Sequence, residues 1–160
     1  MVLQNDHPEY ILDCLLKERG LTLSLAESCT GGKLASLFTA ISGCSQYFKG
    51  GVISYSNEAK EKILGVDFDD IKEYGAVSQT VVEQMVSCVR EIFNSDCAIA
   101  TSGIAGPGGG TPEKPVGTVW IAVSYKERLI AREFLFSNNR EHNILRACDN
   151  GIRMLLDVIG

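Results

Sequence analysis

Histidine and long hydrophobic runs are both scarce in this sequence. Its 160 residues include only two histidines, His7 and His142, and no apolar run approaches the roughly 20 residues that a membrane-spanning helix needs. None of the six cysteines belongs to a C-x-x-C pair. Structural zinc sites are usually built from closely spaced cysteines and histidines. We therefore expect no metal site and no contact with a membrane.

An excess of acidic side chains excludes a further class of function. The formal net charge is −5, with 22% charged and 45% apolar residues. An acidic surface repels a phosphate backbone, so we expect no nucleic-acid partner. The length and composition are those of one globular domain over residues 1–160. Because the N-terminal segment is polar and does not resemble a signal peptide, we expect a cytoplasmic protein with reduced cysteines.

The pattern of apolar residues predicts alternating helices and strands. Apolar runs indicate strands at residues 21–26, 51–55, 97–101, 116–125 and 129–136. Helical spacing and capping residues indicate helices within residues 6–20, 33–42, 57–64, 78–93 and 138–159. The last two strands flank a short charged turn and indicate a β-hairpin. Alternating strands and helices predict a layered α/β domain, and the hairpin makes its sheet mixed.

Some details of this assignment concern single segments. The first helix is predicted to begin with a capping box at Asp6. Its apolar residues are taken to be Tyr10, Ile11, Cys14 and Leu15. The stretch 66–75 is acidic and is expected to form a loop. Either Asn138 or Asn139 is expected to cap the last helix.

Ser28 is the first candidate for chemistry. It lies between a predicted buried strand and the turn Thr30, Gly31 and Gly32, which leads into a helix. This arrangement places a small polar side chain and free backbone N–H groups at the carboxyl edge of a sheet. A serine there can be a nucleophile and the amides can hold an anion, but a serine before a helix often serves only as an N-cap. The neighbouring Cys29 is a rival nucleophile, because a helix N-terminus favours a thiolate.

Lys60 is the second candidate, because it lies in the first turn of a predicted helix, where the helix dipole disfavours a cation. The dipole and burial would both lower the pKa of this lysine and make it a usable general base. Serine–lysine pairs are an established alternative to the Ser-His-Asp triad. A solvated surface lysine is the simpler interpretation. Neither histidine follows a predicted strand, although the last helix could bring His142 near the site.

Three predicted strand ends lead into polar or glycine-rich residues, at positions 28–32, 55–60 and 102–110. In an open α/β sheet such ends gather at one edge, so these segments are expected to meet in one cleft. The glycine-rich loop is neither a P-loop nor a Rossmann fingerprint. Its amides can form an anion nest, or it can be a simple surface loop. Arg140 at the start of the last helix can either share an anion with helix amides or lie in solvent.

Five short motifs occur in one order, at residues 26–32 (AESCTGG), 55–60 (YSNEAK), 75–78 (GAVS), 102–107 (SGIAGP) and 114–119 (KPVGTV). Together they resemble the CinA C-terminal domain family, the nicotinamide-nucleotide amidohydrolases, from about residue 6 to the end. The resemblance implies a bacterial cytoplasmic enzyme with a three-layer α/β/α sandwich and a mixed, mainly parallel sheet. It also implies hydrolysis of the carboxamide of nicotinamide mononucleotide to nicotinate mononucleotide and ammonia, in pyridine-nucleotide recycling. The resemblance implies no metal or organic cofactor. It also implies a homo-oligomer, and a dimer is the form we expect.

The resemblance also implies roles for individual residues. Ser28 matches the family nucleophile and Lys60 its general base. Tyr55 matches a polar residue of the site, from which departing ammonia could receive its proton. Backbone N–H groups of the Thr30–Gly31–Gly32 turn, or of the loop at Gly103, would stabilise the oxyanion.

Two further matches concern substrate binding. Ser102 matches a polar residue that lines the site, and Arg140 matches an arginine that contacts the substrate. Relatives commonly carry Gly-Asp before this arginine, whereas Asn138 and Asn139 stand here. Two other functions stay open at this point. One is a nucleotide- or partner-binding module without catalysis, and the other is an amidase for another small amide.

Overall fold

The computed structural model describes residues 7–137 and 139–160, so the predictions made for Asp6 and Asn138 lie outside the described residues. The helices are α1 (Pro8–Arg19), α2 (Lys33–Thr39), α3 (Asn57–Ala59), α4 (Phe68–Tyr74), α5 (Gln79–Phe93) and α6 (Arg140–Ile159). Two short turns are the 3₁₀ turn η2 (Cys44–Gln46) and the π-helical turn η3 (Lys60–Leu64). The strands are β1 (Leu23–Glu27), β2 (Phe48–Ile53), β3 (Cys97–Gly103), β4 (Thr118–Tyr125) and β5 (Arg128–Leu135).

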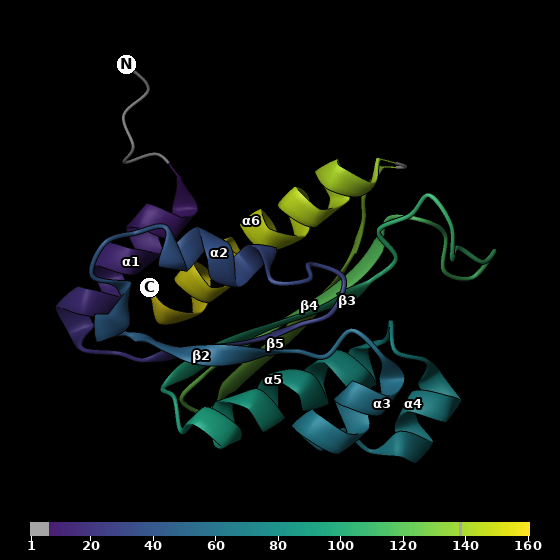
Figure 1. Ribbon diagram of the computed structural model, residues 1–160, viewed down its shortest axis with the longest axis horizontal. Helices are drawn as coiled ribbons and strands as arrows, with labels where there is room; N and C mark the ends of the chain where they lie inside the picture. The colour runs from purple at the N-terminus through teal and green to yellow at the C-terminus, as the bar shows by residue number, and fades with distance from the viewer. Residues whose placement is uncertain (1–6, 138) are drawn as a thin grey trace.

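The five strands form one sheet in the order β2-β1-β3-β4-β5. β1 pairs in parallel with β2 and β3, whereas β4 pairs antiparallel with β3 and β5. β4 is thus the only described strand that runs against the others, and it forms the predicted hairpin with β5. The sheet is mixed and mainly parallel, as predicted. Helices cover both of its faces, which gives the predicted three-layer α/β/α arrangement (Figure 1).

Each face of the sheet packs against its own set of helices (Figure 1). α1, α2 and α6 cover one face, where Leu12 and Ile152 belong to the core. α4, α5 and η3 cover the other face, where Val82 belongs to a second core. β3 serves both cores by alternation, since Ile99 packs in the first and Ala98 in the second. Of the helices in the described residues, none is long and apolar enough to cross a membrane.

The face that α1 buries differs in part from the prediction, although Leu15 is partly buried against the core as expected. Leu12 and Leu16, one helical turn apart, are fully buried, whereas Ile11 is 47% exposed and Cys14 is exposed. The sequence carries apolar residues on two adjacent faces of this helix. Packing of α1 against α6 decides between them, and this contact is invisible in the local pattern.

The segment that was expected to be a loop is largely helical. α4 spans Phe68–Tyr74, and the carboxylate of Asp67 caps it by accepting the amides of Asp69 at 2.8 Å and Asp70 at 3.3 Å. Ile71 on its inner face is buried. The acidic residues are therefore the favourable first turn of a short helix, which the loop prediction missed.

The carboxyl ends of β1, β2 and β3 meet at one edge of the sheet, because these neighbouring strands are parallel. Glu27, the last residue of β1, pairs with Ile53 on β2 and with Thr101 on β3. Ser28 comes directly after β1, and Ser102 directly after the paired Thr101. The fold therefore brings the three polar segments to the same place.

Candidate active site

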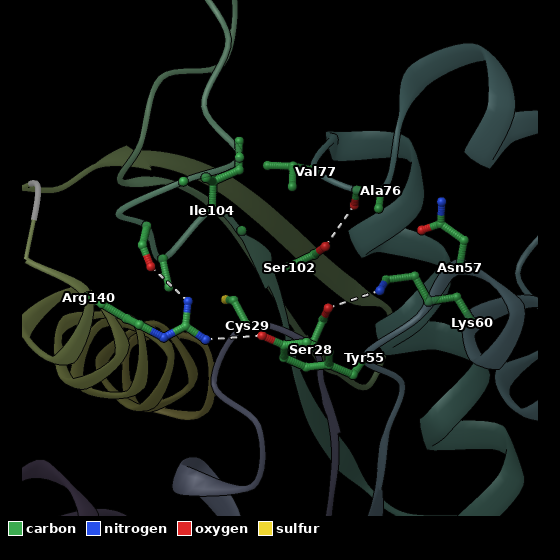
Figure 2. A pocket seen from close by; sticks show the side chains of 15 residues that line it. Ser28, Cys29, Tyr55, Asn57, Lys60, Ala76, Val77, Ser102, Ile104 and Arg140 are labelled. Carbon is green, nitrogen blue, oxygen red and sulfur yellow. Dashed lines mark hydrogen bonds between the residues drawn. The ribbon is translucent and has the colours of Figure 1, made fainter.

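Ser28 and Lys60 contact each other at this edge of the sheet. The Lys60 Nζ lies 2.9 Å from Ser28 Oγ and donates a second hydrogen bond, of 2.7 Å, to the Ser54 carbonyl oxygen. The lysine is 1% exposed and the serine 7%. Figure 2 shows the two side chains pointing toward one another from the ends of different elements. This is the geometry that a nucleophile and its base require.

A change of helix type accompanies the burial of Lys60. Ser56 caps α3 by accepting the amide of Ala59 at 3.0 Å, and the chain then widens into the π-helical turn η3. In this turn the Lys60 carbonyl accepts the amide of Val66 at 3.0 Å. Burial lowers the pKa of Lys60 from 10.5 to about 8. A lysine with such a pKa is roughly a tenth to a fifth neutral near physiological pH, and this neutral form can accept a proton.

Glu27, which the sequence did not single out, fixes the turn between β1 and α2. Its carboxylate is 2% exposed and accepts hydrogen bonds from Thr30 Oγ1 at 2.6 Å, Leu34 N at 2.9 Å and Ala35 N at 3.0 Å. The residue before α2 is Gly32, which has no side chain to cap the helix. Glu27 supplies that cap from the end of the strand. The sequence held a signal for this capping role of Glu27. The first turn of α2 contains no acidic residue, so a carboxylate from outside the helix is favourable at its N-terminus.

The turn that was expected to supply oxyanion donors lies beside the Ser28–Lys60 pair. Thr30 Oγ1 is 2.8 Å from Thr101 Oγ1, and the Gly31 amide donates to the Ser28 carbonyl at 3.0 Å. Thr30, Gly31 and Gly32 do not line the cavity that contains Ser28. They line a second cavity of about 710 Å³, together with Lys33, Ser36, Arg140, Glu141, Ile144 and Leu145.

A first cavity of about 280 Å³ contains Ser28 and Lys60. Ser102 lies on its wall and donates to the Ala76 carbonyl at 2.7 Å, which ties the segment before α5 to β3 (Figure 2). At Gly103 a Cβ would lie 2.6 Å from Val119 Cγ2, so the strand can carry only glycine here. The remaining lining residues are Cys29, Tyr55, Asn57, Val77, Ile104, Ala105, Gly106, Gly108, Gly109 and Arg140.

Arg140 and Tyr55 close the end of the first cavity away from Lys60. The Arg140 guanidinium donates to the Gly106 carbonyl at 2.8 Å and to the Tyr55 hydroxyl at 3.1 Å (Figure 2). Arg140 lines both cavities and therefore lies at their border. Lys60 and Arg140 are both cations, and among the described residues no carboxylate lines the first cavity. The cavity thus favours an anionic ligand although the chain as a whole is acidic.

The alternative nucleophile and base are less well placed. Cys29 lines the first cavity, but burial raises the pKa of its thiol to about 12, so it stays protonated. His142 is exposed and lines neither cavity. Among the described residues, no three His, Cys, Asp or Glu side chains are grouped to hold a metal ion. Lys60 is therefore the base within reach of Ser28.

Similar sequences occur in several bacteria. The chain is 44% identical over 144 residues to a CinA-like protein of Thermotoga maritima and 45% identical over 139 residues to a CinA-like protein of Cytophaga hutchinsonii. These matches cover 90% and 87% of this chain, but only 35% and 33% of the two relatives. The chain thus spans about a third of the length of these relatives.

Solved structures show the same fold along the whole match. The competence/damage inducible protein CihA of Agrobacterium tumefaciens superposes with a TM-score of 0.93 at 33% identity, covering 96% of this chain and 94% of that one. The competence damage-inducible protein A (ComA) of Klebsiella pneumoniae superposes with a TM-score of 0.90 at 32% identity, covering 95% and 96%. The sequence model of the CinA C-terminal domain matches residues 6–159. The chain therefore belongs to the CinA C-terminal domain family.

Proposed function

We propose that this chain hydrolyses the carboxamide of nicotinamide mononucleotide to nicotinate mononucleotide and ammonia. The observation that carries the proposal is the 2.9 Å contact between Ser28 Oγ and the buried Lys60 Nζ, whose pKa burial lowers to about 8. A neutral lysine next to a hydroxyl is the arrangement that serine–lysine acyl transfer requires. The sequence motifs that resemble nicotinamide-nucleotide amidohydrolases select the carboxamide among possible acyl substrates.

The proposed reaction begins with neutral Lys60. Its Nζ accepts the proton of Ser28 Oγ as that oxygen attacks the carboxamide carbon, giving a tetrahedral oxyanion. Backbone N–H groups next to Ser28 or near Gly103 stabilise this oxyanion, and each such donor lowers the barrier by about 3 kcal/mol. Collapse breaks the C–N bond, and the proton on Lys60 passes to the leaving ammonia. Tyr55 is the other proton donor that we consider for this step.

The second half of the reaction removes the acyl group from Ser28. Neutral Lys60 accepts a proton from water as the water oxygen attacks the ester carbon. Collapse of the second tetrahedral intermediate breaks the bond to Ser28 Oγ, which takes the proton back from Lys60. The carboxylic acid leaves as nicotinate mononucleotide. Every proton transfer uses side chains that lie in the first cavity, and the proposed chemistry requires no metal or organic cofactor.

The two cavities suggest how the ends of the substrate are placed. The pyridine carboxamide would occupy the first cavity, beside Ser28, and the 5′-phosphate would lie near Arg140 at the border with the second. Two N–H groups of Arg140 already donate hydrogen bonds, one to the Gly106 carbonyl and one to the Tyr55 hydroxyl. A guanidinium carries five N–H donors, so a phosphate can be bound without losing both contacts. Ser102 would contribute to the wall against which the ring packs.

The test is ammonia release from nicotinamide mononucleotide in the presence of a chelator. We expect Ser28→Ala to lower turnover by roughly 1,000-fold or more while the protein stays folded, because the attacking oxygen is lost. Cys29→Ala is the matched variant one residue along, and we expect it to retain most activity. Loss of turnover in Cys29→Ala with retention in Ser28→Ala would show that the nucleophile is misassigned.

Two measurements separate this proposal from its alternatives. Calorimetry that finds tight binding of the mononucleotide, without any turnover, would favour a nucleotide-binding module. A substrate panel of nicotinamide, nicotinamide riboside and the mononucleotide tests whether the phosphate is needed. Because the first cavity has cationic side chains and no carboxylate among the described residues, we expect the mononucleotide to be the preferred substrate. Equal turnover of all three would point to a general small-amide amidase.

A further inference from the structure

Three consecutive carbonyl groups on the wall of the first cavity are each held by a different donor. The Ile104 carbonyl accepts the Gly117 amide at 2.8 Å. The Ala105 carbonyl accepts Asn143 Nδ2 at 3.0 Å, and the Gly106 carbonyl accepts Arg140 Nη1 at 2.8 Å. Residues 104–106 all line the cavity. The wall opposite Lys60 is thus fixed through side chains of α6 as well as through backbone contacts.

Asn143 is the buried member of this set. It is 1% exposed, which is unusual for an amide side chain, and its hydrogen bonds account for that burial. Nδ2 donates to the carbonyls of Ala105 and Ser137, at 3.0 Å and 2.8 Å, and Oδ1 accepts the Ser137 hydroxyl at 3.2 Å. A purely packing role at this position would be filled by an apolar residue at lower cost. The amide is needed because two carbonyl groups converge on it.

The spacing of Asn143 and Arg140 explains what the amide does. They lie three residues apart in the first turn of α6, so their side chains leave the same face of the helix. Asn143 holds the carbonyl of Ala105, and Arg140 holds the carbonyl of the next residue, Gly106. The position of Gly106 therefore depends on Asn143. The position of the Arg140 guanidinium, which also donates to the Tyr55 hydroxyl, depends in turn on the Gly106 carbonyl.

We propose that Asn143 is a positioning residue, which docks the cavity loop onto α6 and thereby sets where the Arg140 guanidinium meets the substrate. It does not touch the reacting atoms. Its kinetic consequence rests on the proposed function, because it concerns the binding of the mononucleotide. Its structural consequence, the immobilisation of the loop after Ile104, is independent of any substrate.

The test compares Asn143→Ala with Asn150→Ala. Both remove an asparagine amide from α6, but Asn150 donates only within the helix, to the Arg146 carbonyl. We expect Asn143→Ala to raise KM for the mononucleotide about tenfold and to change kcat by less than about threefold. A tenfold rise is the effect expected when about one hydrogen bond from the displaced Arg140 to the substrate is lost. Hydrogen exchange of the Ile104 and Gly117 amides, which donate to the Thr118 and Ile104 carbonyls at 2.8 Å, should become faster in this variant, while exchange in the middle of the core strands is unchanged. Asn150→Ala should alter neither quantity.

A milder variant covers the case in which Asn143→Ala does not fold. Ser137→Ala removes the hydroxyl that orients the Asn143 amide, and it should raise KM and loop exchange in the same direction by a smaller factor. Loop exchange like that of the wild type in Asn143→Ala, or in Ser137→Ala where only that variant folds, would overturn the inference. So would a fall in kcat with KM unchanged. A wild-type protein that does not turn over the mononucleotide would refute the proposed function alone, since the exchange measurement still decides the role of Asn143.

Discussion

Replacing Lys60 with methionine should abolish activity. It should also relieve the protein of the free-energy penalty for burying a charged ammonium group. Methionine has a similar shape and suits the buried position, but it cannot accept the Ser28 proton. In the folded protein burial lowers the pKa of Lys60 from 10.5 to about 8, because the charged ammonium loses its water. The folded state therefore disfavours the protonated lysine, whereas the unfolded chain does not.

The size of this effect follows from the pKa difference. A gap of about 2.5 pKa units at about 1.36 kcal/mol each means that the buried ammonium costs about 3 kcal/mol at neutral pH. The cost is complete below about pH 8, where Lys60 is protonated in both states, and it fades as the pH rises toward 10.5. The methionine variant loses the hydrogen bond to the Ser54 carbonyl, which costs about 1–3 kcal/mol at every pH.

Denaturant unfolding of both proteins at about pH 7 and about pH 10 separates the two contributions. The lost hydrogen bond cancels in the comparison, so the wild type should gain about 2–3 kcal/mol relative to Lys60→Met between the two pH values. Turnover of the mononucleotide should be lower by several orders of magnitude in the variant than in the wild type at both pH values. If the stability difference does not change with pH, Lys60 is not a buried base of lowered pKa. If turnover falls only slightly, the base lies elsewhere.

Three further predictions concern the same site. Because Lys60 must be neutral and burial lowers its pKa to about 8, kcat/KM should rise with pH up to about 8 and level off above it, as a pH–rate profile will show. Glu27→Gln leaves a helix amide of α2 facing an NH₂ group, so urea unfolding should show a loss of about 1–3 kcal/mol in stability. This variant should also have a lower kcat with little change in KM. An unchanged kcat would show that the cap does not position Ser28. Gly106→Ala places a Cβ against Val116 at a φ of 87°, so stability should fall by about 1–3 kcal/mol and KM should rise; a silent variant would contradict the fixed cavity wall.

The helix patterns show where local information sufficed. α5 lies within the predicted range 78–93, and Ser78 caps it by accepting the Val81 amide. The capping signal and the apolar face both lie in adjacent residues, which is why local information was enough here. The same reasoning misplaced Ile11 and Cys14 on the buried face of α1, because the choice of face depends on α6, far away in the sequence. It also missed α4, since a short helix is stabilised mainly by its cap at Asp67 and by the burial of Ile71.

The sequence by itself determined the candidates for chemistry in this protein. A serine at a strand end and a lysine early in a helix are visible as local patterns, because capping, strand and glycine-turn signals act over a few residues. Their placement in one cleft was also predictable, because parallel strands bring their carboxyl ends to one edge of the sheet.

Only the tertiary structure decided which groups surround that pair. Glu27 takes the amides of α2, the turn at Thr30 faces the second cavity, and Asn143 reaches back from the last helix to the cavity wall. It also decided the burial of Lys60, which lowers its pKa to about 8. The contact of Asn143 with the cavity wall joins residues distant in the chain, and burial is a property of the packed fold, so no local pattern encodes either of them.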